Sequence, residues 1–166
     1  MEYGLSLGSN LGDRQAWLAC AAERVASLSS VRVIACSAIY ETEPVDVRPE
    51  YRDSAFLNAV LIVAASDAPE SLAERLRVIE SELGRVRQED RNAPRPIDID
   101  LIYADTLQIE TAGLTLPHPR WAARRFVVQP LADVRPDLVL PGQSRTVSQI
   151  LATLPVRPAA ERWGEF

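Results

Sequence analysis

Short apolar runs alternate along the chain with stretches in which apolar residues recur every three or four positions. The runs cover residues 3–10, 31–42, 56–66 and 96–105, and they predict four β-strands. Two stretches between them have helical spacing, carried by Trp17, Leu18, Ala21, Ala22, Val25 and Leu28 and then by Leu72, Leu76, Ile79 and Leu83. The order β-α-β-β-α-β predicts an α+β protein with a ferredoxin-like core, in which both helices lie on one face of an antiparallel sheet.

Turn and capping residues set the ends of the predicted helices. Asp67 is placed to cap the second helix, with Pro69 in its first turn and Gly84 at its end. The stretch "LGSNLGDR" before the first helix holds two glycines but matches neither GxGxxG nor the Walker phosphate loop. We interpret it as a strand-to-helix turn in which Asn10 or Asp13 caps the helix.

Beyond residue 105 the chain is punctuated by prolines, and "TVSQILATLP" has the pattern of one further helix. We therefore expect a C-terminal extension that wraps the core, and a single domain over residues 1–166. Earlier in the chain, "EPVDVRPEYRD" predicts a loop of about ten residues, long enough to suggest a functional role.

Composition narrows the classes of protein to which the chain can belong. The 166 residues are 47% hydrophobic and 25% charged, which is typical of a globular protein. The formal net charge of -5 argues against broad binding to nucleic acid or to an anionic membrane. All 18 basic residues are arginine, which excludes a Walker-type lysine and a Schiff-base lysine. Any bound anion must therefore be held by arginine.

Histidine and cysteine usage excludes further kinds of site. His118 is the single histidine, so zinc motifs that need two histidines are excluded, and Cys20 and Cys36 are too far apart for a CxxC site. We expect both cysteines to be reduced core residues. Because the chain lacks an apolar run of the ~20 residues that a membrane span needs and does not start like a signal peptide, we expect a cytoplasmic location.

Two acidic residues on the fourth predicted strand are candidate metal ligands. Residues two apart in a strand point to the same face, so Asp98 and Asp100 should lie side by side, about 6–7 Å apart, with the neighbouring isoleucines facing the core. Mg²⁺ binds a pair of carboxylates together with phosphate oxygens and water, and two ions ~4 Å apart can share such a pair. The alternative interpretation is the solvated polar face of an edge strand.

Arginines precede this acid pair in a proline-containing loop, at Arg85, Arg87, Arg91 and Arg95. Guanidinium groups bind phosphate through paired hydrogen bonds and stay charged, so the combination of arginines and acids predicts a site for a polyphosphate. The alternative is that Glu89 and Asp90 neutralise the arginines in surface ion pairs.

A second basic group, "HPRWAARRF", contains His118, Arg120, Arg124 and Arg125 interleaved with Trp121 and Phe126. His118 between two prolines is either a structural histidine or one that faces a ligand. Phe56 and Phe126 are equally compatible with a plain core. Asn58 lies inside an apolar run, where a buried amide needs hydrogen-bond partners, and the edge of a flat heterocycle would supply them.

Five motifs in sequence order resemble the 6-hydroxymethyl-7,8-dihydropterin pyrophosphokinase family of folate biosynthesis. They are "LGSNLGDR", "YETEPV", "FLNAV" and the patterns GRVRxxxRxxPRxIDIDL and LPHPRxxxRRFV, and they extend from residue 7 to residue 127. The resemblance implies transfer of pyrophosphate from ATP to the hydroxymethyl group of the pterin, with release of AMP.

The resemblance also implies a role for individual residues. Two Mg²⁺ ions would be held by Asp98 and Asp100, and the expected catalytic residues are Arg85, Arg95, Asp98 and Asp100. ATP would be contacted by Arg85, Arg87, Arg91, Arg95, His118 and Arg124. The pterin would be bound by Phe56, Phe126, Asn58 and the backbone of Thr42 and Val45. The loops around residues 43–54 and 84–96 would be mobile lids.

Three positions depart from the commoner pattern of that family. Ala93 replaces a glycine, Pro96 stands where threonine is frequent, and Pro119 stands where some members have a tyrosine, whose hydroxyl hydrogen bond a proline cannot donate. These changes bear on loop closure and ATP contacts.

Two other classes of function are compatible with parts of the pattern. A ferredoxin-like module that binds a nucleotide without chemistry would use the arginines but would have little use for two acids on one face. A two-metal nucleotidyltransferase acting on nucleic acid is disfavoured by the negative net charge. We expect a monomer that acts on small molecules.

Overall fold

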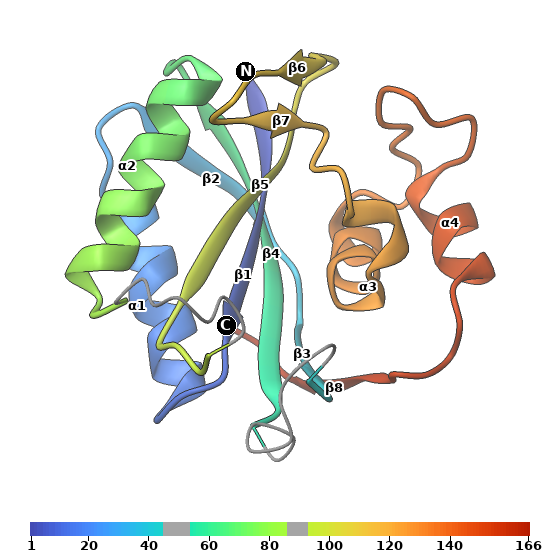
Figure 1. Cartoon of the computed structure of the whole chain (residues 1–166), viewed down its shortest axis with the longest axis horizontal. Helices are drawn as coiled ribbons and strands as arrows, with labels where there is room; N and C mark the ends of the chain where they lie inside the picture. The colour runs from blue at the N-terminus through green and yellow to red at the C-terminus, as the bar shows by residue number, and fades with distance from the viewer. Residues whose placement is uncertain (45–53, 86–92) are drawn as a thin grey trace.

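The computed structural model describes residues 1–44, 54–85 and 93–166. An antiparallel sheet runs through the centre of the molecule, with strand order β5-β1-β4-β3-β8 and with β2 also paired to β4 (Figure 1). Its strands are β1 (Glu2–Ser9), β2 (Val31–Cys36), β3 (Ile39–Thr42), β4 (Phe56–Ala65), β5 (Asp98–Ala104) and β8 (Ala160–Gly164). A small separate sheet pairs β6 (Ile109–Glu110) with β7 (Thr115–Leu116).

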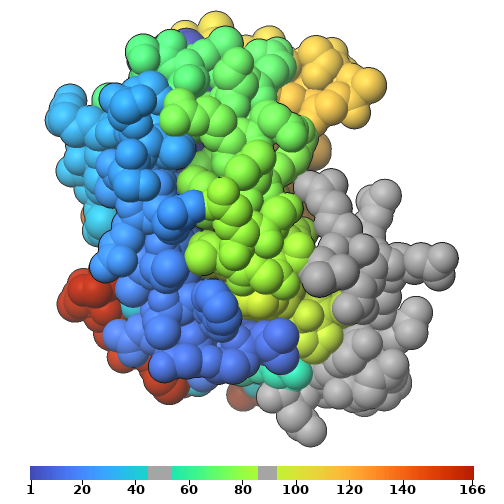
Figure 2. Space-filling view, turned by 90° about the vertical axis from the view of Figure 1, so that its left-hand side faces the viewer, coloured from blue at the N-terminus to red at the C-terminus, as the bar shows by residue number. Residues whose placement is uncertain are grey.

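One face of the sheet is covered by α1 (Arg14–Ala26) and α2 (Pro69–Glu82), as Figures 1 and 2 show. Alternate residues of the strands point to these helices and form the larger core, among them Leu5, Leu7, Leu61, Ile97 and Ile99. The ferredoxin-like α+β fold predicted from the apolar pattern is confirmed, because the period of two in the strands and the spacing of three to four in the helices both present one apolar face.

The opposite face of the sheet is covered in part by the C-terminal extension, which contains a 3-10 turn η2 (Trp121–Ala123), α3 (Arg125–Val134) and α4 (Val147–Thr153). Their apolar residues form a second core with Val60 and Ile62 of β4 and Ile102 of β5. The chain then returns as β8 and pairs with β3 at the sheet edge. The predicted extension around the core is therefore present, but it brings two helices to the second face, where the pattern indicated only α4.

Two local predictions were wrong. Residues 31–42 form two strands, because the Ser37 hydroxyl accepts a hydrogen bond from the Val60 amide at 2.8 Å and donates to the Ala38 carbonyl, which interrupts the ladder. Asp67 does not cap α2, whose N-cap is Ala68 without a side-chain bond.

Other local expectations had mixed outcomes. Asp13 caps α1 by accepting from the Ala16 amide, as one of the two predicted candidates. Cys20 is partly buried but Cys36 is exposed, so the prediction that both are core residues was wrong for Cys36, which lies at the end of the edge strand β2. Within the described ranges, no helix has the length and apolar character needed to cross a membrane.

Candidate active site

The register of three neighbouring strands brings the predicted site residues into one row. Gly8 at the end of β1 pairs with Asn58 of β4 on one side and with Asp98 of β5 on the other. Two residues back along β1, on the same face of the sheet, Ser6 pairs with Asp100. Neighbouring strands lie about 4.8 Å apart, so the Asn58 and Asp98 backbones are about 10 Å apart across Gly8. Asn58 and Asp98 therefore stand on the face of the sheet that α3 covers only in part.

Alternation along β5 places the two acids as the pattern predicts. Ile97, Ile99 and Leu101 are buried in the core under α1 and α2, whereas Asp98 is half-buried and Asp100 exposed on the opposite side. The solvated face of an edge strand does not describe this arrangement, because charged side chains converge on Asp98.

Asp98 is bracketed by two arginines. Arg85 forms ion pairs with Asp98 and with Glu80 of α2, and Arg95 approaches the second oxygen of Asp98 at 3.0 Å. Glu80 is 3% exposed and also accepts a hydrogen bond of 2.6 Å from the Ile99 amide. Glu80 thus ties α2, Arg85 and strand β5 together below the acid pair.

The pKa values of two carboxyl groups in this cluster are raised, mainly by burial and also by the nearby charge of Asp98. Burial has the largest effect on Glu80 and, with the charge of Asp98, raises its pKa to about 7, although the hydrogen bond from the Ile99 amide acts in the opposite direction. Desolvation by surrounding protein atoms, followed by the charge of Asp98, raises the pKa of Asp100 although its tip reaches solvent. A cation bound beside Asp98 and Asp100 would therefore stabilise the two carboxylates.

His118 contributes a neutral imidazole to the same face. Burial, and then the positive charges of Arg124 and Arg120, lower the pKa of His118 to about 4. Its Nδ1 accepts a hydrogen bond of 3.1 Å from the Arg120 amide, so at neutral pH the proton lies on Nε2. A small pocket is lined by His118 together with Asp100, Arg124, Phe126, Trp121 and Ser6. The Nε2 proton is therefore available for a hydrogen bond to an anion.

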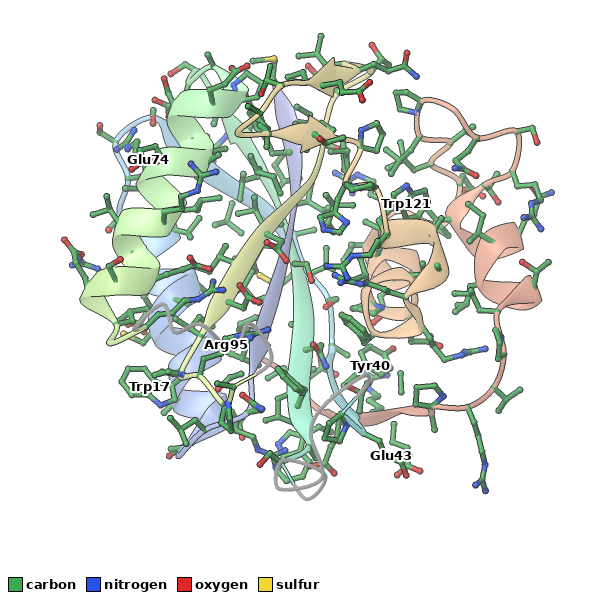
Figure 3. All side chains as sticks on the ribbon, viewed as in Figure 1. Trp17, Tyr40, Glu43, Glu74, Arg95 and Trp121 are labelled. Atoms are coloured by element: carbon green, nitrogen blue, oxygen red, sulfur yellow. The ribbon has the colours of Figure 1, made fainter. Side chains whose placement is uncertain are left out.

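The two predicted aromatic rings lie beside arginines. The Arg95 guanidinium is 5.9 Å from the centre of the Phe56 ring, and that of Arg124 is 5.4 Å from the centre of the Phe126 ring. Phe56 opens β4, and Phe126 lies in the first turn of α3. Figure 3 shows Arg95 near the ends of β1 and β5.

The amide of Asn58 is 4% exposed and is oriented by a neighbouring strand. Its Nδ2 donates to the hydroxyl of Thr42 in β3 at 2.8 Å. A Cβ at Gly8 would lie 3.2 Å from Oδ1 of Asn58 and 3.8 Å from the Phe56 ring. The missing side chain at Gly8 leaves space beside both residues.

The structure joins most of the predicted residues into two neighbouring groups. The first contains Arg85, Arg95, Asp98, Asp100, His118, Arg124 and Phe126, and the second contains Thr42, Phe56 and Asn58. Val45, Arg87 and Arg91 lie outside the described residues. Arg125 of the basic group is directed elsewhere, since it donates to the carbonyls of Leu154 and Pro155.

Three residues of the site were missed from the sequence. Glu80 carried a signal, because a glutamate next to Ile79 on the apolar stripe of α2 is out of place unless it is paired. Gly8 and Asn10 were interpreted only as parts of a turn. In the structure Asn10 holds the Arg95 backbone. Its side-chain Oδ1 accepts from the Arg95 backbone N–H at 2.9 Å, and its backbone N–H donates to the Arg95 carbonyl at 3.3 Å.

A divalent cation fits this donor set only together with a ligand. Among the described residues, no group of three or more histidine, cysteine, aspartate or glutamate side chains is arranged to hold a metal. Asp98 and Asp100 offer two carboxylates on one face, which suits Mg²⁺ because it takes one or two carboxylates plus phosphate oxygens and water.

The ferredoxin-like sheet carries, on one face, an acid pair surrounded by arginines, which is the arrangement expected of a phosphoryl-transfer enzyme. Residues 4–136 match the model of the 7,8-dihydro-6-hydroxymethylpterin-pyrophosphokinase family. The chain belongs to this family.

Two relatives agree with this assignment, and a solved structure shares the fold. The chain is 43% identical over 151 residues to the 2-amino-4-hydroxy-6-hydroxymethyldihydropteridine pyrophosphokinase of Methylorubrum extorquens, covering 90% of this chain and 91% of the relative. It is 42% identical over 131 residues to the protein of the same name from Bacillus subtilis, covering 78% and 75%. A crystal structure described as HPPK-DHPS in complex with substrates has the same fold, with a TM-score of 0.68 and 14% identity over 92% of this chain and 43% of that one.

Proposed function

We propose that this pyrophosphokinase transfers the pyrophosphoryl group of ATP to the hydroxymethyl oxygen of 6-hydroxymethyl-7,8-dihydropterin in folate biosynthesis, with two Mg²⁺ ions at Asp98 and Asp100. The observation that carries the proposal is the row formed by Asn58, Gly8 and Asp98. It sets an amide suited to a heterocycle and a carboxylate suited to a metal about 10 Å apart on one face, with a glycine between them.

The acidic side of the row is equipped for a triphosphate. Arg85, Arg95 and Arg124 stay charged at any physiological pH and offer paired hydrogen bonds to phosphate oxygens. The Nε2 proton of His118 adds a neutral donor. The arginines now paired with Asp98 would turn to ATP as Mg²⁺ neutralises the carboxylates, so the cluster stays close to charge balance when both bind.

The other side of the row is equipped for the pterin. Phe56 and Phe126 would pack on the two faces of the flat ring, with energies of about 0.5–1.5 kcal/mol beyond their buried area. Asn58 already gives one Nδ2 hydrogen to Thr42, which sets the direction of the amide. Its second hydrogen and Oδ1 would bond the donor and acceptor edge of the pterin, and the backbone of Thr42 and Val45 would complete the pocket.

The reaction is an in-line attack of the hydroxymethyl oxygen on the β-phosphorus, with AMP as the leaving group. When bound, Mg²⁺ supplies charge neutralisation of the phosphate oxygens. The residues of the chain position the two substrates and stabilise the developing charge, which is the main requirement of phosphoryl transfer, so a strong general base is not needed.

An assay with ATP, Mg²⁺ and the reduced hydroxymethylpterin tests the proposal, with AMP and the pterin pyrophosphate as expected products. Formation of ADP would contradict pyrophosphoryl transfer while leaving a simple kinase. Asp98→Asn and Asp100→Asn should each lower kcat/KM about 100-fold, which corresponds to a loss of transition-state stabilisation on the order of 3 kcal/mol. Turnover close to wild type in both variants would overturn the metal assignment.

The roles of Arg87 and Arg91 in ATP binding, a monomeric state and a cytoplasmic location stay predictions. A nucleotide-binding module without chemistry would bind ATP equally well with and without Mg²⁺, and equilibrium binding of ATP in chelator measures this directly.

A further inference from the structure

One arginine on the α1 side of the sheet connects four elements behind the proposed pterin site. Arg14 opens α1, and its Nη1 donates to the Ala55 carbonyl at 2.9 Å and pairs with Glu41 of β3 at 2.8 Å. Its guanidinium also lies 5.2 Å from the centre of the Trp163 ring in β8. A single side chain thus links α1, β3, the residue before β4, and β8.

The strand that carries Trp163 lies outside the matched family segment, which ends at residue 136. β8 is the last strand of the sheet and pairs with β3 along its length, with Ala160 opposite Thr42 and Glu161 opposite Glu41. Figure 2 shows the red C-terminal residues next to the blue residues of α1. Trp163 is 49% exposed, so its ring covers the guanidinium without being part of the core.

The partners of Arg14 are the direct neighbours of two residues that face the proposed pterin. Ala55 precedes Phe56, and Glu41 precedes Thr42, while Thr42 and Phe56 pair with each other across β3 and β4. Because successive residues of a strand point to opposite faces, Arg14 holds these two strand ends from below while Thr42 and Asn58 meet above, through the 2.8 Å hydrogen bond between them.

We propose that Arg14, stacked on Trp163 of the C-terminal strand, is a positioning residue that sets the pterin pocket and thereby its affinity for the pterin. The proposal rests on the function proposed above. Neither Arg14 nor Trp163 touches the substrate. They act by fixing the separation of the strand ends that carry Thr42 and Phe56.

Substitutions at Trp163 separate the stacking from the rest of the fold. Trp163→Leu removes both the aromatic face and the indole N–H that donates to Gln15 Oε1 at 3.4 Å, whereas Trp163→Phe removes only this N–H and keeps an aromatic face. Arg162→Ala is the matched control, because Arg162 lies on the same strand, its side chain is exposed, and the ion pair given for it among the described residues is with the exposed Glu165. Arg14→Gln tests the other partner.

Steady-state kinetics give the first readout. We expect Trp163→Leu and Arg14→Gln to raise KM for the pterin roughly tenfold, since a displacement of about 1 Å in a binding group can cost up to 100-fold. KM for ATP should stay within about twofold, and Trp163→Phe and Arg162→Ala should behave like wild type. Equal losses for ATP and pterin, or no change in either, would overturn the proposal.

Hydrogen exchange gives a readout that does not depend on activity. Peptides covering residues 39–42 and 54–60 should exchange faster in Trp163→Leu than in Arg162→Ala, and peptides of β5 should not change. If wild type releases no AMP, the proposed function fails, whereas the exchange comparison still decides the positioning role. Unchanged exchange in both peptides would reject it even if the enzyme is active.

Discussion

Acidification should destabilise the folded chain through His118. Its pKa is lowered from 6.5 to about 4 by burial and by Arg124 and Arg120. Between these two values the unfolded chain binds a proton that the folded chain rejects, so the free energy of unfolding decreases as the pH falls from about 6.5 towards 4.

The size of this effect follows from the two pKa values. At pH 5 the linkage relation gives about 2 kcal/mol for one histidine with these values. Solvent reaches part of the imidazole, which reduces the shift, so we expect a loss of about 1–2 kcal/mol between pH 7 and pH 5 from this group.

Urea unfolding at pH 7, 6 and 5, followed by tryptophan fluorescence in chelator at constant ionic strength, measures the effect. His118→Gln is the comparison, because glutamine retains an acceptor for the Arg120 amide but does not titrate. The wild type should lose more stability than the variant between pH 7 and 5, by the amount given above. Parallel stability profiles, or a wild type that gains stability on acidification relative to the variant, would refute the neutral histidine.

Three further substitutions test other parts of the structure. Gly8→Ala should raise KM for the pterin with little change in stability, because its Cβ would lie 3.2 Å from Oδ1 of Asn58; an unchanged KM would argue against a pterin at this place. Gly4→Ala should lower the urea-unfolding free energy by about 1–3 kcal/mol, because its Cβ would lie 2.3 Å from the Tyr103 ring. Glu80→Leu should lower it by about 1–3 kcal/mol, because the buried Ile99 amide loses its acceptor while Arg85 keeps its ion pair with Asp98. Glu80→Gln keeps an acceptor for that amide and should cost less; equal losses in the two variants would show that the hydrogen bond to Ile99 does not contribute to stability.

The local pattern was enough for the first two helices and for the central sheet, apart from β8 and the break at Ser37. A strand with a period of two and a helix with a spacing of three to four each leave one apolar face, and burying both faces together permits few arrangements. The position of α3 was not predicted, because prolines on both sides and Pro130 inside the helix obscure its periodicity. The break at Ser37 was missed for a related reason, since it depends on a contact with β4.

Residue types and spacing alone indicated which side chains carry the chemistry. Asp98 and Asp100 share a face because of strand geometry, and the chain has no lysine, so arginine is its permanently charged group for binding phosphate. The contacts that these residues make were decided by the tertiary structure. Glu80 reaches Arg85 only because α2 packs on β5, and Asn58 faces Asp98 only through the register of β1 between them. These contacts join residues that are far apart in sequence, so they cannot be predicted from periodicity or spacing within one segment.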